Sequence, residues 1–333
     1  MTRYLIRRLT GTVPVILLIS MLVFLLIQAA PGDPTLMLLG EEATAADIAE
    51  ARQRWGLEQP VYIQYVKFLR SAVQGDFGQS FKYAQPVSEV IAMRIPATIE
   101  LALFSVVIAI VLAIPLGVWA GAKPNSWTDN VGTTFGLCGI SMPSFWFGIM
   151  LILLFAGILN IFPSAGRDTY GISGPKITGF YLLDSIIQGN WMASRDALGH
   201  IFMPALALGA NMMGILMRVT RSSILDVMHE EYVITARAKG LAERGVMWRH
   251  VFVNALIPVI TMVGLELGTL LSGSIIVETV FSWPGSGSLL ITGLNARDYP
   301  LVTGLVLTYT LAFVAINFII DALYAIVDPR IRY

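Results

Sequence analysis

The chain has 333 residues, of which 22 are Lys or Arg and 22 are Asp or Glu, so that its formal net charge is zero. Charged residues make up 13% and hydrophobic residues 56%, whereas a soluble globular protein has about 25% charged and about 45–50% apolar residues. This composition excludes a soluble enzyme, and the neutral charge without a basic tail argues against nucleic acid as a partner. The single cysteine, Cys138, excludes an internal disulfide framework.

The hydrophobic residues are gathered in six stretches, each long enough for the roughly 20 residues that cross a hydrocarbon core as a helix. These stretches are 9–30, 97–120, 131–158, 198–217, 253–280 and 301–327. Prolines inside them, such as Pro143, are tolerated in a bilayer because neighbouring helices satisfy the freed carbonyl groups. We therefore predict an all-α, polytopic membrane protein with six transmembrane helices. A signal peptide is the alternative for 9–30, but Pro31 directly after Ala29–Ala30 disfavours cleavage there.

Basic residues near the ends of the stretches predict the orientation. With the N terminus inside, most Lys and Arg residues fall on inner segments, including Arg7, Arg8 and six residues within 218–252. The termini, 1–8 and 328–333, are then cytoplasmic. The outer segments are then 31–96, 159–197 and 281–300. The long segment 31–96 carries little weight in this comparison, because long loops cross the membrane regardless of charge.

Each of the two long outer segments has two possible roles. In 31–96, Thr44 with Asp47 predicts a helix to about Trp55, and Pro60 suits the first turn of a second helix. Segment 159–197 is rich in Gly, Ser and aromatic residues. Each segment is either a small lid packed on the spans or a docking surface for an external partner.

The inner segment 218–252 is charged, and residues 230–239 predict a helix that Gly240 ends. Alanine and threonine at 235, 236 and 238 make this helix thin, so that its backbone can approach another protein closely. A second helical stretch, 243–256, runs into Pro258. The segment is therefore either a charged loop at the lipid headgroups or a helix that seats in a partner's groove.

Residues 231–241 (EYVITARAKGL) with 254–258 (NALIP) behind them resemble the EAA loop of the permease subunits of binding-protein-dependent ABC importers. In that family the loop forms a coupling helix that docks in a cleft of the ATPase subunit. The resemblance implies this role for Glu231, Tyr232, Thr235, Ala236, Arg237, Ala238, Lys239, Gly240 and Leu241.

Further motifs run from end to end of the chain and are similar to the B-type permease of dipeptide and oligopeptide importers. They are RRL at 7–9, PGDP at 31–34, ETVFSWPG at 278–285, DYP at 298–300 and DPRIR at 328–332. Two residues depart from that pattern: Ser286 stands where a bulkier apolar residue is commoner, and Glu266 where a neutral polar residue is usual. The resemblance implies the type I ABC importer permease fold with extended periplasmic loops, in the bacterial inner membrane.

Energy for transport must come from another polypeptide, since the chain has no Gly-x-x-x-x-Gly-Lys-Ser/Thr loop to cradle ATP phosphates. The resemblance implies a second, C-type permease subunit, two ABC ATPase subunits that bind ATP and Mg²⁺, and an extracytoplasmic substrate-binding protein. We expect no cofactor or metal in this chain and no catalytic residue.

A transport path needs polar side chains within the spans. Glu266 is the strongest candidate, because a charged group at mid-span costs roughly 2.5–3.5 kcal/mol on insertion scales and should face protein or water. Thr269 and Ser272 lie within reach of the same helix face, and Asn211 is a further candidate. Each could instead hold helices or subunits together. Glu278 and Asp321, near span ends, are interpreted as interfacial anchors.

The sequence disfavours two other classes of protein. A secondary transporter commonly shows inverted repeats, which the sequence does not display. An intramembrane enzyme is disfavoured because His229-Glu230 lacks the second histidine of a His-Glu-x-x-His motif, and no histidine lies near Ser286 and Ser288 to activate them. Within the importer reading the expected cargo is a dipeptide or short peptide, with glutathione, nickel chelates, haem or oligosaccharides as alternatives.

Overall fold

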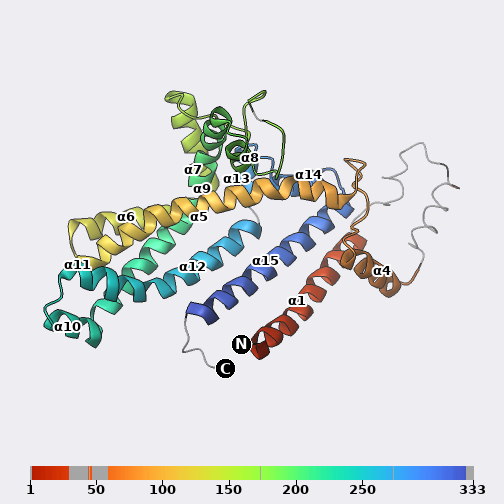
Figure 1. Ribbon diagram of the computed structural model, residues 1–333. Coiled ribbons are helices and arrows are strands. Elements are labelled where there is room, and N and C mark those ends of the chain that lie inside the picture. The colour runs from red at the N-terminus through yellow and green to blue at the C-terminus, as the bar shows by residue number, and fades with distance from the viewer. Residues whose placement is uncertain are drawn as a thin grey trace. The chain divides into compact units, whose positions relative to one another are not determined.

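The computed structural model describes residues 2–29, 44, 46, 59–172, 174–272 and 274–327, and these residues contain helices and no strand (Figure 1). The α-helices are α1 (Thr2–Ala29), α4 (Val61–Val73), α5 (Val87–Ala122), α6 (Trp127–Ser141), α7 (Ser144–Leu151), α8 (Tyr181–Ile187), α9 (Trp191–Met228), α10 (Glu231–Ala238), α11 (Glu243–Gly245), α12 (Val253–Ser272), α13 (Ile275–Val280), α14 (Ser286–Asn295) and α15 (Tyr299–Val327). Two π-helical segments are η1 (Ile152–Ile158) and η2 (Val246–Phe252). The helix predicted to run from Thr44 to about Trp55 falls almost entirely outside the described residues.

Four described helices are long and apolar enough to cross a membrane. They are Val87–Ala122, Trp191–Met228, the continuous run Glu243–Leu270 and Tyr299–Ile320. A fifth candidate is the pair formed by α6 and the α7–η1 run, and α1 contributes a shorter apolar helix, Gly11–Leu25, in its described part. The chain is therefore an all-α, polytopic membrane protein.

The predicted third span, 131–158, is not one straight helix. Its two halves, Trp127–Ser141 and Ser144–Ile158, are bent by 104° at a short break, and Figure 1 shows α7 turning away from α6. Pro143 lies in the break and Met142 before it is extended, with φ −89° and ψ 128°. Proline disfavours the helical conformation of the residue that precedes it and offers no backbone N–H, which accounts for the break.

Helices also form outside the ranges that hydrophobicity indicated. Helix α9 continues past residue 217 to Met228, and its Arg221 forms a two-pronged ion pair with Asp129 of α6: Nε lies 2.5 Å from Oδ1 and Nη2 lies 2.8 Å from Oδ2. The segment 281–300, predicted as a loop, contains α14.

The contacts divide the chain into two units, each described here by itself. The smaller unit comprises Thr2–Ile95 and Leu289–Leu311. In it α4 packs on α1 through Tyr65 and Phe24, whose ring centroids are 5.5 Å apart. The start of α5 packs against α14 and α15 in an apolar cluster whose buried residues are Val87, Val90, Ile91, Leu289, Leu301 and Leu305.

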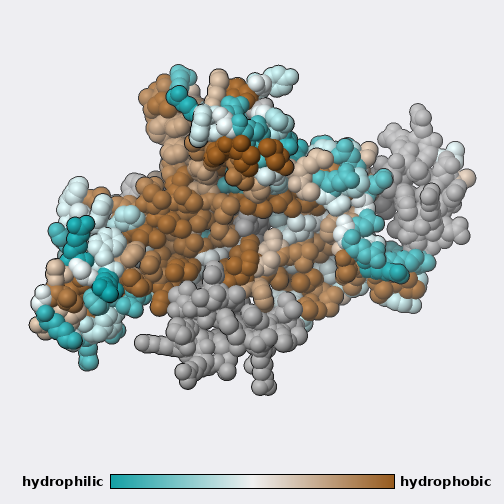
Figure 2. Space-filling view, viewed as in Figure 1, coloured by the Kyte–Doolittle hydropathy of each residue, from teal (hydrophilic) through white to brown (hydrophobic). Residues whose placement is uncertain are grey.

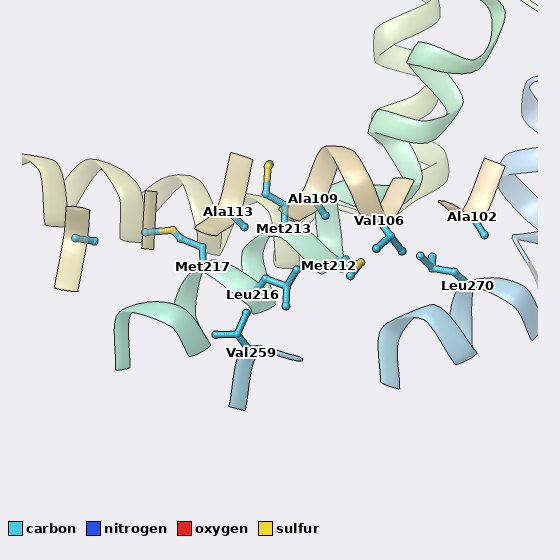
Figure 3. Packing of buried hydrophobic residues seen from close by; sticks show 11 residues of the cluster. Ala102, Val106, Ala109, Ala113, Met212, Met213, Leu216, Met217, Val259 and Leu270 are labelled. Atoms are coloured by element: carbon cyan, nitrogen blue, oxygen red, sulfur yellow. The ribbon is translucent and has the colours of Figure 1, made fainter. Parts of the chain in front are cut away.

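The larger unit comprises Pro96–Ser288 and Ala312–Tyr333. Its central cluster is formed by α5, α9 and α12 (Figure 3). The side chains on these helices that pack together in that view are Ala102, Val106, Ala109, Ala113, Met212, Met213, Leu216, Met217, Val259 and Leu270. Alanines on α5 face methionines on α9, so the short side chains of one helix admit the long ones of the other.

Helices α6 and α9 approach each other closely through glycine. A Cβ added at Gly214 of α9 would collide with the carbonyl oxygen of Gly136 of α6, and one added at Gly139 would lie 2.7 Å from the carbonyl oxygen of Ala210. Small residues at such a crossing let two backbones pack directly, which is a common mode of helix association in membranes.

Candidate coupling helix and translocation cavity

Helix α10 is a short helix that begins after Glu230 and ends at Ala238. Glu231 places a negative charge in its first turn, where it favours the helix dipole. Gly240 has φ +76°, a left-handed conformation that glycine adopts at low cost, and this turns the chain at the end of the helix. The predicted helix over 230–239 and its end at Gly240 are confirmed.

One side of α10 is fixed to the rest of the larger unit. Val233 is fully buried and Ala236 is 6% exposed, and both belong to an apolar cluster. The other buried members come from α5, α9, η2 and α12, and are Val118, Ile224, Val246, Val251 and Ala255. The structure therefore places Ala236, one of the residues predicted for coupling, against its own chain.

The opposite side of α10 is open. Its exposed residues, together with those of the following turn, are Glu231, Tyr232, Ile234, Thr235, Ala238, Lys239, Gly240 and Leu241. Figure 2 shows hydrophilic side chains gathered over α10 and α11, next to the hydrophobic surface of the neighbouring helices. Partial burial, and then the charge of Glu230, raise the pKa of Tyr232, so its hydroxyl stays protonated. This surface offers an aromatic ring, aliphatic side chains and a lysine to a partner.

A single ion pair closes the turn after α10. Arg237 Nη2 lies 2.8 Å from Glu243 Oε1, with 35% and 62% of the two side chains exposed. An ion pair this exposed is screened by water and contributes little to stability. The apolar cluster, rather than this pair, therefore holds α10 in place.

Three of the four predicted path residues lie together. Asn211 of α9 and both Glu266 and Thr269 of α12 line one cavity of ≈ 390 Å³. The Thr269 hydroxyl donates a hydrogen bond to the Glu266 backbone carbonyl (2.7 Å). The side chain of Ser272 falls outside the described residues. Three polar residues identified from the sequence are thus brought together by the fold around one cavity.

The cavity also has a wall that the sequence analysis missed. Residues 140–144, at the break between α6 and α7, line it with two serine side chains, Ser141 and Ser144. Pro143, within a long apolar stretch, was the available signal. A break exposes backbone groups and polar side chains inside a span, and in a membrane protein this is tolerated where the break lines a cavity.

Glu278 is not an interfacial anchor, because its side chain is completely buried. Its carboxylate accepts hydrogen bonds from Thr98 Oγ1 (2.8 Å), Ser274 Oγ (2.9 Å) and the Ser288 backbone N–H (2.9 Å). Ser286 donates its backbone N–H to Thr98 Oγ1 (2.7 Å), so the atypical serine at 286 belongs to the same network. Neutral donors satisfy the carboxylate, and the sequence signal was the Gly-Ser-Gly-Ser run at 285–288. The side chain of Asp321 is outside the described residues.

Segment 159–197 is attached to α5 by a buried ion pair. Arg167 Nη2 lies 2.5 Å from Glu100 Oε2, and the two side chains are 6% and 8% exposed. The Arg167 guanidinium also lies 4.1 Å from the centre of the Tyr181 ring and donates a hydrogen bond to the Gly179 carbonyl (2.8 Å). Glu100 accepts a second hydrogen bond from the Leu182 backbone N–H (2.9 Å). The segment is thus a folded element with a defined attachment.

Asp184 organises the turn before α8. It accepts hydrogen bonds from the backbone N–H groups of Ile177, Thr178 and Gly179 at 3.1, 2.8 and 3.0 Å. Burial opposes ionisation of Asp184, but the hydrogen bonds from the Thr178 hydroxyl and these backbone groups outweigh it and lower its pKa.

These features agree with the comparisons to known proteins. Residues 113–333 match the family "Binding-protein-dependent transport system inner membrane component", and residues 1–102 match its N-terminal companion family. The chain belongs to the binding-protein-dependent transport system inner membrane component family. It is a multi-pass inner-membrane permease subunit of an ABC importer, with the all-α permease fold of that family.

Individual relatives match over the full length. The chain is 39% identical over 333 residues, 100% of both chains, to the dipeptide transport system permease protein DppB of Alkalihalophilus pseudofirmus. It is 40% identical, again over 100% of both chains, to the glutathione transport system permease protein GsiC of Escherichia coli. The probable D,D-dipeptide transport system permease protein DdpB of Escherichia coli is 39% identical over 98% of this chain and 96% of its own length.

Proposed function

We propose that this chain forms half of a translocation path for dipeptides or other short peptides, with a second permease subunit forming the other half. Two of the relatives carry dipeptide transport in their names. A peptide is zwitterionic and hydrated, so it needs a polar route through hydrocarbon. The cavity lined by Asn211, Glu266 and Thr269 supplies such a surface within the spans.

The observation that carries this proposal is the attachment of α10. Its buried side packs in one cluster with Val118 of α5, Ile224 of α9 and Ala255 of α12. A force applied to its exposed side therefore acts on three membrane helices at once. One of the two partner ATPase subunits, which bind ATP and Mg²⁺, docks on this side of α10 and moves it as the two ATPases close. A substrate-binding protein delivers the peptide from the opposite side of the membrane.

This role fixes the orientation. Helix α10 must lie in the cytoplasm, and with it both termini. The distribution of Lys and Arg between inner and outer segments supports this arrangement.

Cysteine cross-linking tests the coupling assignment in the intact complex. In a Cys138→Ser background, Ala238→Cys should form a cross-link to the ATPase subunit, since Ala238 is exposed on α10. The matched control is Tyr170→Cys, whose side chain is fully exposed (102%) in segment 159–197. It should react with an impermeant thiol reagent from outside the cell and give no cross-link. Labelling of Ala238→Cys from outside would overturn the proposal.

Transport itself is tested with the reconstituted complex. Labelled dipeptide should accumulate in proteoliposomes only with ATP and binding protein present, and accumulation without a partner ATPase would contradict the proposal. Glutathione is the second candidate cargo, because several relatives at 40% identity are glutathione permeases. Uptake of labelled glutathione in place of dipeptides would favour it.

A further inference from the structure

The cavity between the α6–α7 break, α9 and α12 has an unusual electrostatic composition. Its described lining is Ile140, Ser141, Met142, Pro143, Ser144, Leu208, Asn211, Met212, Glu266, Thr269 and Leu270. Among these residues Glu266 is the one ionisable side chain, and no Lys, Arg or His accompanies it. When Glu266 is ionised, the cavity carries a negative charge that its own described walls do not neutralise.

The Glu266 carboxylate has free hydrogen-bonding capacity. The Thr269 hydroxyl directs its short hydrogen bond to the backbone carbonyl of Glu266 (2.7 Å) and lies 3.5 Å from the carboxylate oxygen Oε2. No described residue forms an ion pair with Glu266. An ionised carboxylate has about four acceptor sites, so most of them remain available to a ligand.

We propose that Glu266 is a subsite for the positively charged ammonium group of a peptide, either its N-terminal amine or a lysine side chain. This inference rests on the proposed peptide-transport function. An ammonium group donates three hydrogen bonds and pairs with a carboxylate in a charge-assisted contact. The Asn211 and Ser144 side chains offer neutral partners beside it, and Leu208 and Leu270 provide apolar wall for the aliphatic part of the peptide.

The consequence is a charge preference at the translocation step. A peptide with an additional positive charge gains a favourable interaction with Glu266, whereas one with an additional carboxylate meets repulsion. Opposite charges about 4 Å apart attract even across water by an amount equivalent to about a fivefold preference. The preference is separate from that of the binding protein, because it belongs to a later step.

The experiment measures uptake of Ala-Lys-Ala, Ala-Gln-Ala and Ala-Glu-Ala by the full reconstituted complex, each peptide preloaded on saturating binding protein. The ratio of lysine-peptide to glutamate-peptide uptake is the readout. Glu266→Gln should lower this ratio by at least about fivefold, the share that the lost attraction alone contributes, and Glu266→Lys should lower it further. Asn211→Asp, which adds a second negative charge to the cavity, should raise it. Glu89→Gln, at an exposed residue in the first turn of α5 that does not line the cavity, is the matched control and should leave it unchanged.

Each outcome decides the proposal. An unchanged ratio in both Glu266→Gln and Asn211→Asp overturns it. If Glu266→Gln abolishes all uptake, the ratio in Asn211→Asp decides, since a rise supports the subsite and no change rejects it. Failure of the wild-type complex to take up the labelled dipeptide as well as all three of these peptides would refute the peptide-transport function itself, which is a different result.

Discussion

Two regions of the larger unit differ in whether a buried ion pair takes part in their attachment. Segment 159–197 is held by a buried ion pair, Arg167–Glu100 at 2.5 Å, together with the apolar contacts of Phe162, which stacks on Phe202. Helix α10 is held by apolar side chains around Val233 and Ala236, and its one ion pair lies in solvent.

The two kinds of contact differ in how much movement they allow. A buried ion pair keeps its energy only in one geometry, because any displacement leaves a charge unpaired in a region of low dielectric. Apolar contacts are non-directional and are retained when side chains slide by small distances. We infer that segment 159–197 is fixed in position, and we call it the platform. Helix α10 can shift slightly while its apolar contacts are kept, and we call these contacts, around Val233 and Ala236, the apolar joint.

The largest effect is expected at the apolar joint. Ala236→Glu would place a carboxylate in the cluster with Val233 and Val118, where burying an unpaired ion costs several kcal/mol and overpacking adds about 1–3 kcal/mol. The amount of folded protein in the membrane, measured by fluorescence-detected size exclusion, should fall sharply.

Ala238→Glu is the matched substitution on the exposed side of α10. It should leave the membrane level unchanged and reduce co-purification of the ATPase subunit. Equal membrane levels for Ala236→Glu and Ala238→Glu would show that the buried cluster does not hold α10.

The next effect concerns the buried pair of the platform. Arg167→Leu leaves Glu100 buried without its partner, which costs about 3–5 kcal/mol. The thermal midpoint should fall, and segment 159–197 should become sensitive to protease in intact complexes. The double variant Arg167→Leu, Glu100→Leu should recover part of the loss, because no unpaired charge remains. No recovery would mean that the Tyr181 and Gly179 contacts of Arg167, rather than its charge, hold the segment.

The fold could be predicted from the sequence where hydrophobicity and chain breakers act locally. The helix ended by Gly240 and the helix after Pro60 depend on neighbouring residues alone, and the structure contains both. Four of the six predicted apolar stretches lie wholly or largely in described helices long enough to cross a membrane. The 104° bend at Pro143 could not be predicted, because a proline inside a span is compatible with a small kink or a full break. Packing decides between them.

The site was predictable in its residue types and not in its partners. Asn211 and Glu266 were identified because polar groups in spans are costly, and they line one cavity. The burial of Ala236 depends on Val118, and that of Glu278 depends on Thr98. Both partners belong to α5, which lies far away in the sequence. A single sequence carries no information on such long-range pairs.

A moderate effect is expected where α6 and α9 approach each other. Gly214→Ala adds a Cβ that collides with the Gly136 carbonyl, and forcing such a contact costs about 1–3 kcal/mol. Gly245→Ala is the control, since a Cβ there meets nothing within 4 Å and alanine favours the helix. Thermal unfolding of the two variants in detergent should move in opposite directions. A neutral Gly214→Ala would show that the two helices can separate freely.

A smaller, pH-dependent effect is expected at Asp184. Its pKa is lowered in the folded protein, so its stabilising contribution is present above the unfolded value of about 3.9 and is lost as the pH falls below it. Asp184→Asn should therefore reduce stability by about 1 kcal/mol near neutral pH. The difference from the wild type should begin to shrink below about pH 4 and disappear only once the pH falls below the lowered pKa of Asp184 in the folded protein, as judged by limited proteolysis of segment 159–197 across the pH range. A difference that persists at low pH would show that the carboxylate charge is not what organises the turn.

The smallest effect is expected at the exposed pair of the joint. Arg237→Gln removes the contact to Glu243, but both side chains are largely hydrated, so thermal unfolding should be unchanged and insensitive to added salt. The shift in thermal unfolding of Arg167→Leu, measured under the same conditions, gives the size expected for the loss of a buried ion pair. If Arg237→Gln destabilised the protein as strongly as Arg167→Leu, α10 would also be fixed by a directional charge contact. It would then be a rigid extension of the spans, and its small movements during coupling would have to be carried by the helices themselves.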